Sequence, residues 1–154
     1  MKESRFAFPP VLSRIVSRLP QTPPAAVLAF ALDRLLFPRL PLADLEALLE
    51  QPLRIEVSDL GLRLALTLTR QGFRPLPLHV APRLTLRAAA RDFLALLRRE
   101  EDADTLFFQR RLVLSGDTEL GLLVKNTLDA IELEIPLLSH LHSRSVSVAN
   151  RQRP

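Results

Sequence analysis

The residues of this chain that could do chemistry are few and widely spaced. Its 154 residues include no Cys, which excludes thiol catalysis, disulfides and Cys-ligated zinc or iron–sulfur centres. Of the three His, His140 and His142 could face one way on a strand and share a metal ion, but no acid or Cys lies nearby to complete the site. His79 stands alone. We therefore expect no bound metal.

Phosphate-binding and nucleophile motifs are also missing from the sequence. With only four Gly, the chain can form neither a Gly-rich phosphate loop nor a dinucleotide fingerprint. It contains no Gly-x-Ser-x-Gly elbow, the turn that exposes the nucleophile of many hydrolases. The sequence predicts no cofactor.

The remaining candidates are charged residues near the start of the last predicted helix. Asp117 and Glu119 could form an acid pair, but carboxylates in a first helical turn more often cap the helix and complement its dipole. Arg110 and Arg111 point to opposite faces of a predicted strand, so they cannot clamp one ligand. We expect Arg111 to form a salt bridge with the acidic stretch 100–104, and we predict that the protein is not an enzyme.

The elements that would position these residues begin with three helices separated by Pro. Apolar residues recur at helical spacing in 11–19, 22–36 and 42–51. The second helix begins at Thr22 as N-cap and ends before Pro38. Because it is apolar nearly all round, we expect it to be buried or to face a ligand.

From residue 53 the hydrophobic period changes to two, which is typical of strands. Segments 53–57 and 62–68 alternate on either side of the turn 58–61, and this pattern predicts a hairpin with one buried face. A strand over 76–80 should lie at a sheet edge because Pro75 and Pro77 flank its start. A further short strand is expected at 84–86.

The last third predicts a helix, a loop, a strand and a closing helix. The helix covers 88–99 with Phe93, Leu94 and Leu97 inward, and 100–104 is expected to be a solvated loop. Residues 110–115 alternate as a strand, and 117–132 carries an unbroken apolar stripe. The order of elements predicts an α+β fold with helices on one face of a mostly antiparallel, curved sheet of four or five strands.

Positive charge is concentrated at the two ends of the sequence. The net charge is +4 and the isoelectric point about 10.8. Residues 1–20 and 144–154 each carry a net charge of +3, and the residues between carry −2. This pattern argues against nucleic-acid binding, which needs basic and aromatic residues gathered on the folded body. It fits contact with an anionic membrane or protein, and equally a role in solubility alone. The basic residues that would contact a membrane are near the N-terminus: Lys2, Arg5, Arg14 and Arg18.

No segment of the sequence is apolar enough to span a bilayer. The longest uncharged apolar stretch, 24–32, is nine residues long, against roughly 20 for a spanning helix. Arg14 and Arg18 interrupt any apolar core of a signal peptide. We expect a cytoplasmic protein that is peripheral at the inner membrane.

The 35 Leu of the sequence leave two interpretations open. The apolar faces of the helices and the sheet could fill one another as an ordinary core. They could instead line an apolar cavity, because aliphatic side chains adapt well to an oily ligand. Composition alone does not choose between them.

One stretch of the sequence carries a family resemblance. The run Phe107-Phe108-Gln109-Arg110-Arg111, followed by Gly116-Asp117-Thr118-Glu119-Leu120-Gly121-Leu122 and Val124-Lys125-Asn126, resembles the sterol carrier protein type two domain. The resemblance is strong over 104–134, weaker back to residue 82, and limited to layout over 1–81. It implies a five-stranded sheet whose covering helices enclose an apolar tunnel for a lipid. On this basis we expect a basic amphipathic segment over 1–21, a lipid-binding domain over 22–134 and a flexible tail over 135–154.

The resemblance also implies a function and a set of lipid-lining residues. Within the family, the run resembles accessory factors of the oxygen-independent route to ubiquinone, which act with the UbiU–UbiV pair of iron–sulfur hydroxylases of the peptidase U32 family. The implied role is to bind polyprenylated phenol or quinone intermediates and present their head groups. The tunnel-lining residues would then be Phe93, Leu94, Leu97, Phe107, Leu112, Leu114, Leu120, Leu123, Val124, Leu128 and Ile131.

Two alternatives to this role stay open. The protein could be a scaffold that carries no lipid and assembles the hydroxylases through Phe107 and Phe108 and the closing helix. It could also bind a phospholipid such as a phosphatidic acid and recruit its partners to the membrane. The tail after residue 134 is short compared with the long helix expected in the family. Oligomer or membrane contacts that depend on such a helix are therefore not expected of this tail.

Overall fold

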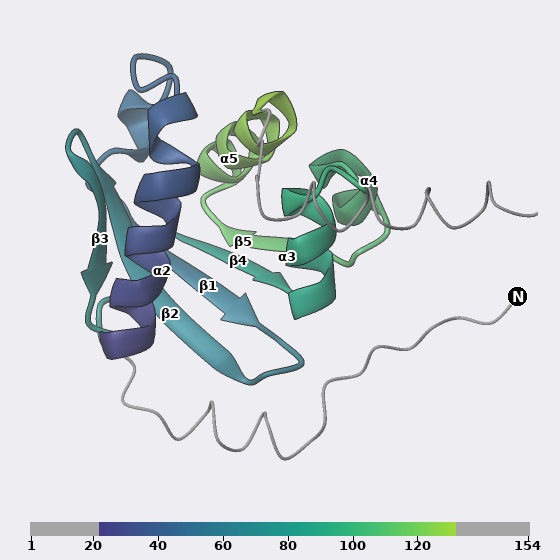
Figure 1. The fold of residues 1–154 in the computed structure, drawn as a ribbon, viewed down its shortest axis with the longest axis horizontal. Helices are drawn as coiled ribbons and strands as arrows, with labels where there is room; N and C mark the ends of the chain where they lie inside the picture. Colours follow the sequence, from purple (N-terminus) through teal and green to yellow (C-terminus); the bar gives the residue numbers. More distant parts are fainter. Residues whose placement is uncertain (1–21, 132–154) are drawn as a thin grey trace, which may run out of the picture.

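Five strands form one mixed sheet in the computed structural model, which describes residues 22–131 (Figure 1). The strand order across the sheet is β3-β2-β1-β4-β5. The strands are β1 (Pro52–Val57), β2 (Leu62–Thr69), β3 (Gly72–Leu76), β4 (Leu84–Ala88) and β5 (Val113–Gly116). All neighbours are antiparallel except β1 and β4, which run parallel. The predicted α+β class is confirmed.

Two tight hairpins build one half of the sheet. The turn 58–61 joins β1 to β2 and ends at Gly61, whose φ of 62° is one that glycine adopts at little cost. Two residues join β2 to β3, and the Thr69 hydroxyl closes this loop by donating to the Gly72 carbonyl and accepting from the Gln71 amide. Even-numbered Leu of β2 face the helices, as the period-two pattern predicts.

The connection from β3 to β4 crosses the opposite face of the sheet. Since β4 pairs with β1, segment 77–83 must pass over β2 and β1 to reach it. Arg54, which the strand alternation places on the face away from Leu53, donates from Nη2 to the carbonyls of Leu78 (3.0 Å) and Val80 (3.4 Å). These bonds hold the crossover against the sheet.

Helices cover the other face of the sheet. They are α2 (Thr22–Leu35), the 3-10 turns η1 (Phe37–Arg39) and η2 (Glu46–Leu48), α3 (Ala90–Leu97), α4 (Ala103–Phe108) and α5 (Thr118–Ala130). In Figure 1, α2 lies along β2 and β3, whereas α3, α4 and α5 lie towards the β4–β5 side. None of the helices within 22–131 is long and apolar enough to cross a bilayer.

A side chain of α2 binds the edge of the sheet. Asp33 Oδ1 accepts the Phe73 amide of β3 at 2.5 Å. A Cβ at the neighbouring Gly72 would lie 2.6 Å from the same oxygen, so the helix can approach the strand this closely only because residue 72 is glycine. Pro75, two residues further along β3, has no backbone N–H that could donate outward from the sheet edge. A strand containing Pro75 thus lies at the sheet edge, but the bounds predicted for it, 76–80, are wrong: β3 ends at Leu76, and Pro77, which also lacks an amide, begins the crossover to β4.

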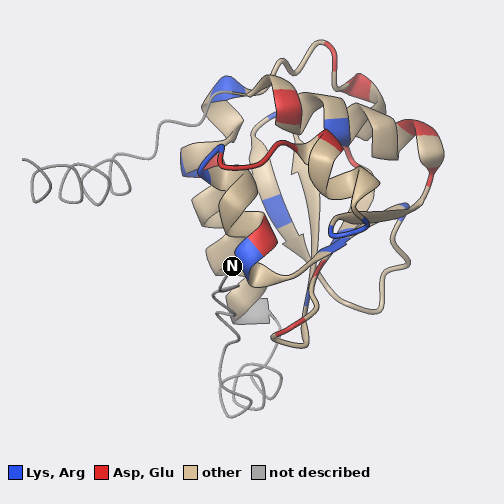
Figure 2. Cartoon of the chain, turned by 90° about the vertical axis from the view of Figure 1, so that its right-hand side faces the viewer, with Lys and Arg blue, Asp and Glu red and all other residues tan. Residues whose placement is uncertain are grey.

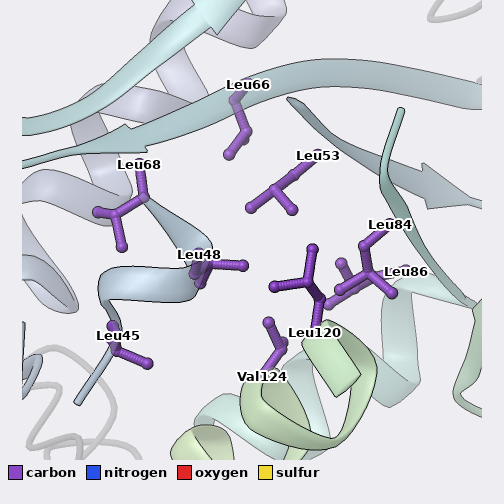
Figure 3. Close-up of a cluster of buried hydrophobic side chains, with 9 residues drawn as sticks. All are labelled: Leu45, Leu48, Leu53, Leu66, Leu68, Leu84, Leu86, Leu120 and Val124. Atoms are coloured by element: carbon purple, nitrogen blue, oxygen red, sulfur yellow. The ribbon is translucent and has the colours of Figure 1, made fainter. Parts of the chain in front are cut away.

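The core between sheet and helices consists of two apolar clusters. The larger joins the sheet to η2 and α5, and Figure 3 shows its nine buried side chains converging: Leu45, Leu48, Leu53, Leu66, Leu68, Leu84, Leu86, Leu120 and Val124. The smaller joins α3 and α4 to the sheet end: Ala88, Leu96, Ala103, Leu106 and Leu112. Leu114 and Leu128 are partly buried and pack against both clusters.

Two further predicted elements differ from those observed. The helix expected over 42–51 is wrong: the segment contains only the short η2 turn, in which Leu45 and Leu48 are buried three residues apart, the spacing that a 3-10 turn brings to one side. The solvated loop expected over 100–104 is wrong in its last residues. There α4 begins at Ala103, with the Asp102 side chain accepting the Thr105 amide at its N-terminus.

The other boundaries shift by a few residues. The helix predicted over 88–99 is α3, and the strand predicted over 110–115 is β5, which begins later because Arg110, with a φ of 59°, still belongs to the turn after α4. The predicted helix 11–19 and the tail from 135 lie outside the described residues.

Candidate functional site

Most of the predicted lipid-lining residues lie in the two apolar clusters. Leu120, Val124 and Leu112 are buried members, and those packed against the clusters are Phe93, Leu114, Leu123 and Leu128. Ile131 is buried at the end of the described chain. Their lining of a tunnel stays a prediction, but the structure brings these residues together from α3, β5 and α5.

The closing helix presents its apolar stripe as predicted. Leu120 and Val124 point from α5 towards Leu84 and Leu53 of the sheet (Figure 3). Leu123 is partly buried beside them, whereas Leu122 on the next position is 50% exposed. Helical periodicity therefore identifies the inward face of α5 correctly.

The predicted inward face of α3 is correct for Phe93, which packs against the smaller cluster, and wrong for Leu94. Leu94 is 41% exposed, and Leu97 is only half-buried. The buried positions are Asp92, Ala95 and Leu96, so the helix is rotated relative to the prediction. The cause is the buried Asp92, whose carboxylate turns inward because it has a cationic partner.

That partner is Arg111, just before β5. Its Nη2 lies 2.5 Å from Oδ1 of Asp92 and its Nη1 2.6 Å from Oε2 of Glu101. Burial alone would lower the pKa of the Arg111 guanidinium. The hydrogen bonds that Arg111 donates to the Glu101 and Asp92 carboxylates outweigh the effect of burial and raise this pKa above its ordinary value. The predicted salt bridge of Arg111 with the acidic stretch is confirmed, and it serves packing.

Charged side chains also hold α4 and α5 together. Asp129 Oδ1 accepts the Ala103 amide at 2.6 Å, and Lys125 binds Asp104. Arg99 donates from Nη1 to the carbonyls of Asp129 and Ile131, both at 2.9 Å, and so satisfies the C-terminal end of α5. Acidic and basic positions accordingly lie close together on this part of the surface (Figure 2).

Asp117 caps α5, as expected from its position after Gly116. Its Oδ1 accepts the amides of Glu119 (3.0 Å) and Leu120 (3.1 Å), and its Oδ2 lies 2.8 Å from Arg83 Nη2. The Arg83 hydrogen bond and the Leu120 amide hold the pKa of this carboxyl below its usual range. A carboxylate engaged in this way is structural, so Asp117 and Glu119 are not an acid pair for catalysis.

Surface clefts in the described part of the chain include two that are lined mainly by polar residues. One of about 530 Å³ lies at the β2–β3 turn, lined by Glu46, Leu49, Glu50, Thr69, Arg70, Gln71 and Arg74. The other, of about 270 Å³, lies between α3 and α5, lined by Leu96, Arg99, Glu100, Glu101, Asp102, Leu128 and Asp129. Of the predicted lining residues, only Leu128 borders either cleft.

The other candidates are exposed or lie beyond the described residues. Phe107 and Phe108 meet edge to face at the surface end of α4, with ring centroids 5.9 Å apart. His79 is exposed, and residues 22–131 contain no cluster of three or more His, Asp or Glu that would hold a metal. His140, His142, Lys2, Arg5, Arg14 and Arg18 fall outside the described residues.

The arrangement of strands and helices agrees with a known family. The model of the SCP-2 sterol transfer family matches residues 33–129, which include the sheet, α3, α4 and nearly all of α5. This chain belongs to the SCP-2 sterol transfer family. The predicted resemblance to the sterol carrier domain is therefore confirmed.

Within the SCP-2 family, curated proteins similar to this chain are ubiquinone biosynthesis accessory factors. The chain is 63% identical over 51 residues to the ubiquinone biosynthesis accessory factor UbiT of Escherichia coli strain K12, and equally to that of strain O157:H7. The matched stretch is 33% of this chain and spans only 29% of the length of those relatives. The resemblance seen in the sequence is thus borne out over part of the chain.

A solved structure supports the fold of this SCP-2 member. The ubiquinone synthesis protein UbiJ-SCP2 superposes with a TM-score of 0.57 and 23% sequence identity, covering 73% of this chain and all of the UbiJ-SCP2 chain. At this identity the match supports the five-stranded sheet with its covering helices. The apolar tunnel expected from the resemblance stays a prediction.

Sequence reasoning missed two contributors to this region, Leu96 and Leu106. Both belong to the smaller cluster and support Leu112. The available signal was the pattern Asp102-x-x-Thr105, an N-cap with a partner three residues on, which marks the start of α4.

Proposed function

We propose that this chain is a lipid-binding accessory factor of oxygen-independent ubiquinone biosynthesis and has no catalytic activity of its own. It would bind polyprenylated phenol or quinone intermediates and present their head groups to the UbiU–UbiV hydroxylases. The observation that carries the proposal is the 63% identity to UbiT over 51 residues, in a chain that belongs to the SCP-2 family.

The packing around α5 supports a lipid site between the two apolar clusters. Leu114 and Leu128 contact both clusters and are only partly buried, as is Leu123. Side chains at such a boundary can separate with less loss of packing than those in the centre of a cluster. A prenyl chain inserted there would bury apolar carbon at about 0.8 kcal/mol per CH₂, which offsets its removal from the bilayer.

A second candidate function is a scaffold that carries no lipid. It is favoured by the close packing of Leu112, Leu120 and Val124 as ordinary core residues, and by Phe108, which is 79% exposed beside Phe107. In this case the aromatic pair would bind the hydroxylases directly. A phospholipid ligand, with recruitment to a membrane, is the third outcome to be distinguished.

The decisive experiment is native mass spectrometry of the full chain purified without detergent, followed by organic extraction and lipid identification. A bound prenylated phenol or quinone supports the carrier function and names the ligand class. A phospholipid alone supports recruitment to the membrane. Protein that is repeatedly empty and still captures the hydroxylase pair contradicts the carrier function and supports the scaffold.

Contact with an anionic membrane is part of the same proposal. The described residues hold 14 Lys and Arg against 14 Asp and Glu, so the excess positive charge belongs to the remaining segments, including Lys2, Arg5, Arg14 and Arg18. Each basic residue near an anionic surface contributes about 1 kcal/mol. Flotation with anionic vesicles should weaken at high salt and on replacing these four residues by Gln. Unchanged flotation would contradict this contact.

A further inference from the structure

The outer face of α2 is apolar and exposed. Val27 is 68% exposed and Phe30 is 62% exposed, three residues apart and therefore on one side of the helix. Between Thr22 and Leu32 the helix carries no charge at all. The Arg34 guanidinium lies over the Phe30 ring, 5.3 Å from its centroid, at one end of this face. Large apolar side chains exposed together on a helix usually mark a surface that something covers.

The sequence directly before α2 has a complementary apolar face. Segment 11–19 repeats apolar residues at helical spacing, with Ser13, Arg14, Ser17 and Arg18 on its other side. Only Pro20 and Gln21 separate it from the first residue of α2. Two helices joined by two to five residues form an antiparallel hairpin. The connection is therefore too short for segment 11–19, as a helix, to reach far from α2.

We propose that segment 11–19 forms a helix that docks antiparallel on the outer face of α2 and covers Val27 and Phe30. This intramolecular interface goes beyond the proposed lipid function and does not depend on it. The occupant is this chain's own segment because its length and point of attachment match the exposed face. Nine helical residues span about 13 Å, the same length as the nine residues of α2 from Thr22 to Phe30.

The register of the pairing follows from the short connection. With Gln21 as the midpoint of the connection, Ile15 and Val27 are each six residues away and lie opposite one another, and Leu12 and Phe30 are each nine residues away and do the same. Both pairs form at once because Leu12 and Ile15, like Val27 and Phe30, are three residues apart. An antiparallel pair of helices repeats its contacts at this spacing.

Docking also leaves the basic side of the segment free. If Leu12 and Ile15 face α2, helical spacing would place Arg14 and Arg18 away from the domain. The hairpin would thus present a cationic outer surface while its apolar side is buried against protein. If a bilayer covered this face instead, the apolar sides of the segment and of α2 would both have to face lipid.

Disulfide trapping tests this register in a chain that has no native Cys. The full-length double variant Ile15→Cys/Val27→Cys should form an intramolecular disulfide under mild oxidation, as should Leu12→Cys/Phe30→Cys. The matched control is Ser13→Cys/Val27→Cys, whose new thiol lies on the far side of the segment. We expect the first pair to oxidise at least about tenfold faster than the control, because only its Cβ atoms come within bonding distance.

Each other outcome contradicts the proposal in a recognisable way. Equal oxidation rates for test and control pairs would mean that the segment does not dock in this register. Disulfides between two chains would make a second copy the occupant. A second readout needs no disulfide: maleimide labelling of Val27→Cys should accelerate about tenfold when Leu12 and Ile15 are both changed to Glu. Labelling that is unchanged would contradict docking of segment 11–19 on this face. Labelling that slows only when anionic vesicles are added would assign the face to the bilayer.

Discussion

Arg111 and Asp92 form an ion pair that joins α3 to the segment entering β5. Arg111 Nη2 and Nε lie 2.5 Å and 3.0 Å from the same Asp92 oxygen, on a side chain that is 4% exposed. A buried carboxylate needs such a partner, since an isolated charge in the interior is strongly destabilising. The pair therefore fixes the rotation of α3 and, with it, which side chains of that helix meet the smaller cluster.

Removing the two partners should have unequal effects on stability. Arg111→Met leaves the buried Asp92 carboxylate without this partner and should reduce the free energy of unfolding by about 3 kcal/mol. Asp92→Asn should cost about 1 kcal/mol, because Arg111 keeps Glu101. The double variant Asp92→Leu/Arg111→Met should be more stable than Arg111→Met alone. Urea denaturation measures all three, and a double variant no more stable than Arg111→Met would show that the unpaired Asp92 carboxylate is not the source of the loss.

Asp117 should make the stability of the protein fall in acid. Its pKa in the folded state is held down by Arg83 and by the Leu120 amide. Above the ordinary value of about 3.9, the carboxyl is ionised in both states and its stabilising contribution is complete. Below that pH the unfolded chain takes up the proton first, so stability declines as the pH falls through the folded-state pKa.

The control for this prediction is Asp117→Asn, which keeps an N-cap acceptor without the charge. Its free energy of unfolding should depend less on pH between about 4 and 2 than that of the parent protein. Arg83→Gln should reduce the dependence in the same way. Identical pH profiles for the three proteins would exclude Asp117 as the origin of the acid sensitivity.

Two glycines near the start of α5 should respond to alanine in opposite directions. Gly116 has a φ of 113°, and a Cβ there would collide with the backbone carbonyl oxygen of Arg83. Gly116→Ala should therefore cost about 2 kcal/mol or more. At Gly121, a Cβ would lie 3.6 Å from a Leu84 methyl and 3.7 Å from Leu114 Cβ, which are ordinary contacts.

Gly121→Ala should stabilise the protein by about 0.5–1 kcal/mol, because Gly121 lies within α5 and alanine favours the helix. Thermal unfolding of both variants measures the contrast. A destabilised Gly121→Ala protein would show that α5 and the sheet approach too closely for even one methyl group.

Leu122 and Leu123 offer a matched test of lipid loading. Leu123 is partly buried between α5 and the larger cluster, and Leu122 is half-exposed on the next position of the same helix. Leu123→Trp adds apolar volume beside the larger cluster, on the side of α5 where the lipid is proposed to insert, and should reduce copurified lipid at least about tenfold. Leu122→Trp should leave it unchanged. Equal lipid content in the two variants would move the site away from α5.

Much of the fold follows from the sequence because its signals are local. The turn 58–61 between alternating segments predicts the β1–β2 hairpin, and Asp117 after Gly116 predicts the start of α5. Arg111 beside an acidic stretch predicts its salt bridge. In each case the residues that decide the structure lie within a few positions of one another or carry opposite charges.

The predictions from the sequence fail where an element is too short for periodicity to show, or where contacts between residues far apart in the chain determine the structure. The six residues of α4 make fewer than two turns, too few for periodicity to reveal them among acids. The rotation of α3 depends on Arg111, which follows Asp92 by 19 positions. A tunnel and a filled core use the same Leu residues, so the lining of a lipid site cannot be read from their spacing.

The contact between Asp33 and Phe73 bears on the behaviour of the protein at high concentration. A sheet edge with free amides can template a strand from a neighbouring chain and so begin aggregation. On β3 one outward amide is already occupied by Asp33, and the next outward position is Pro75, which has none. This side of the sheet is therefore closed to strand addition by neighbouring copies, which favours solubility in the crowded cell.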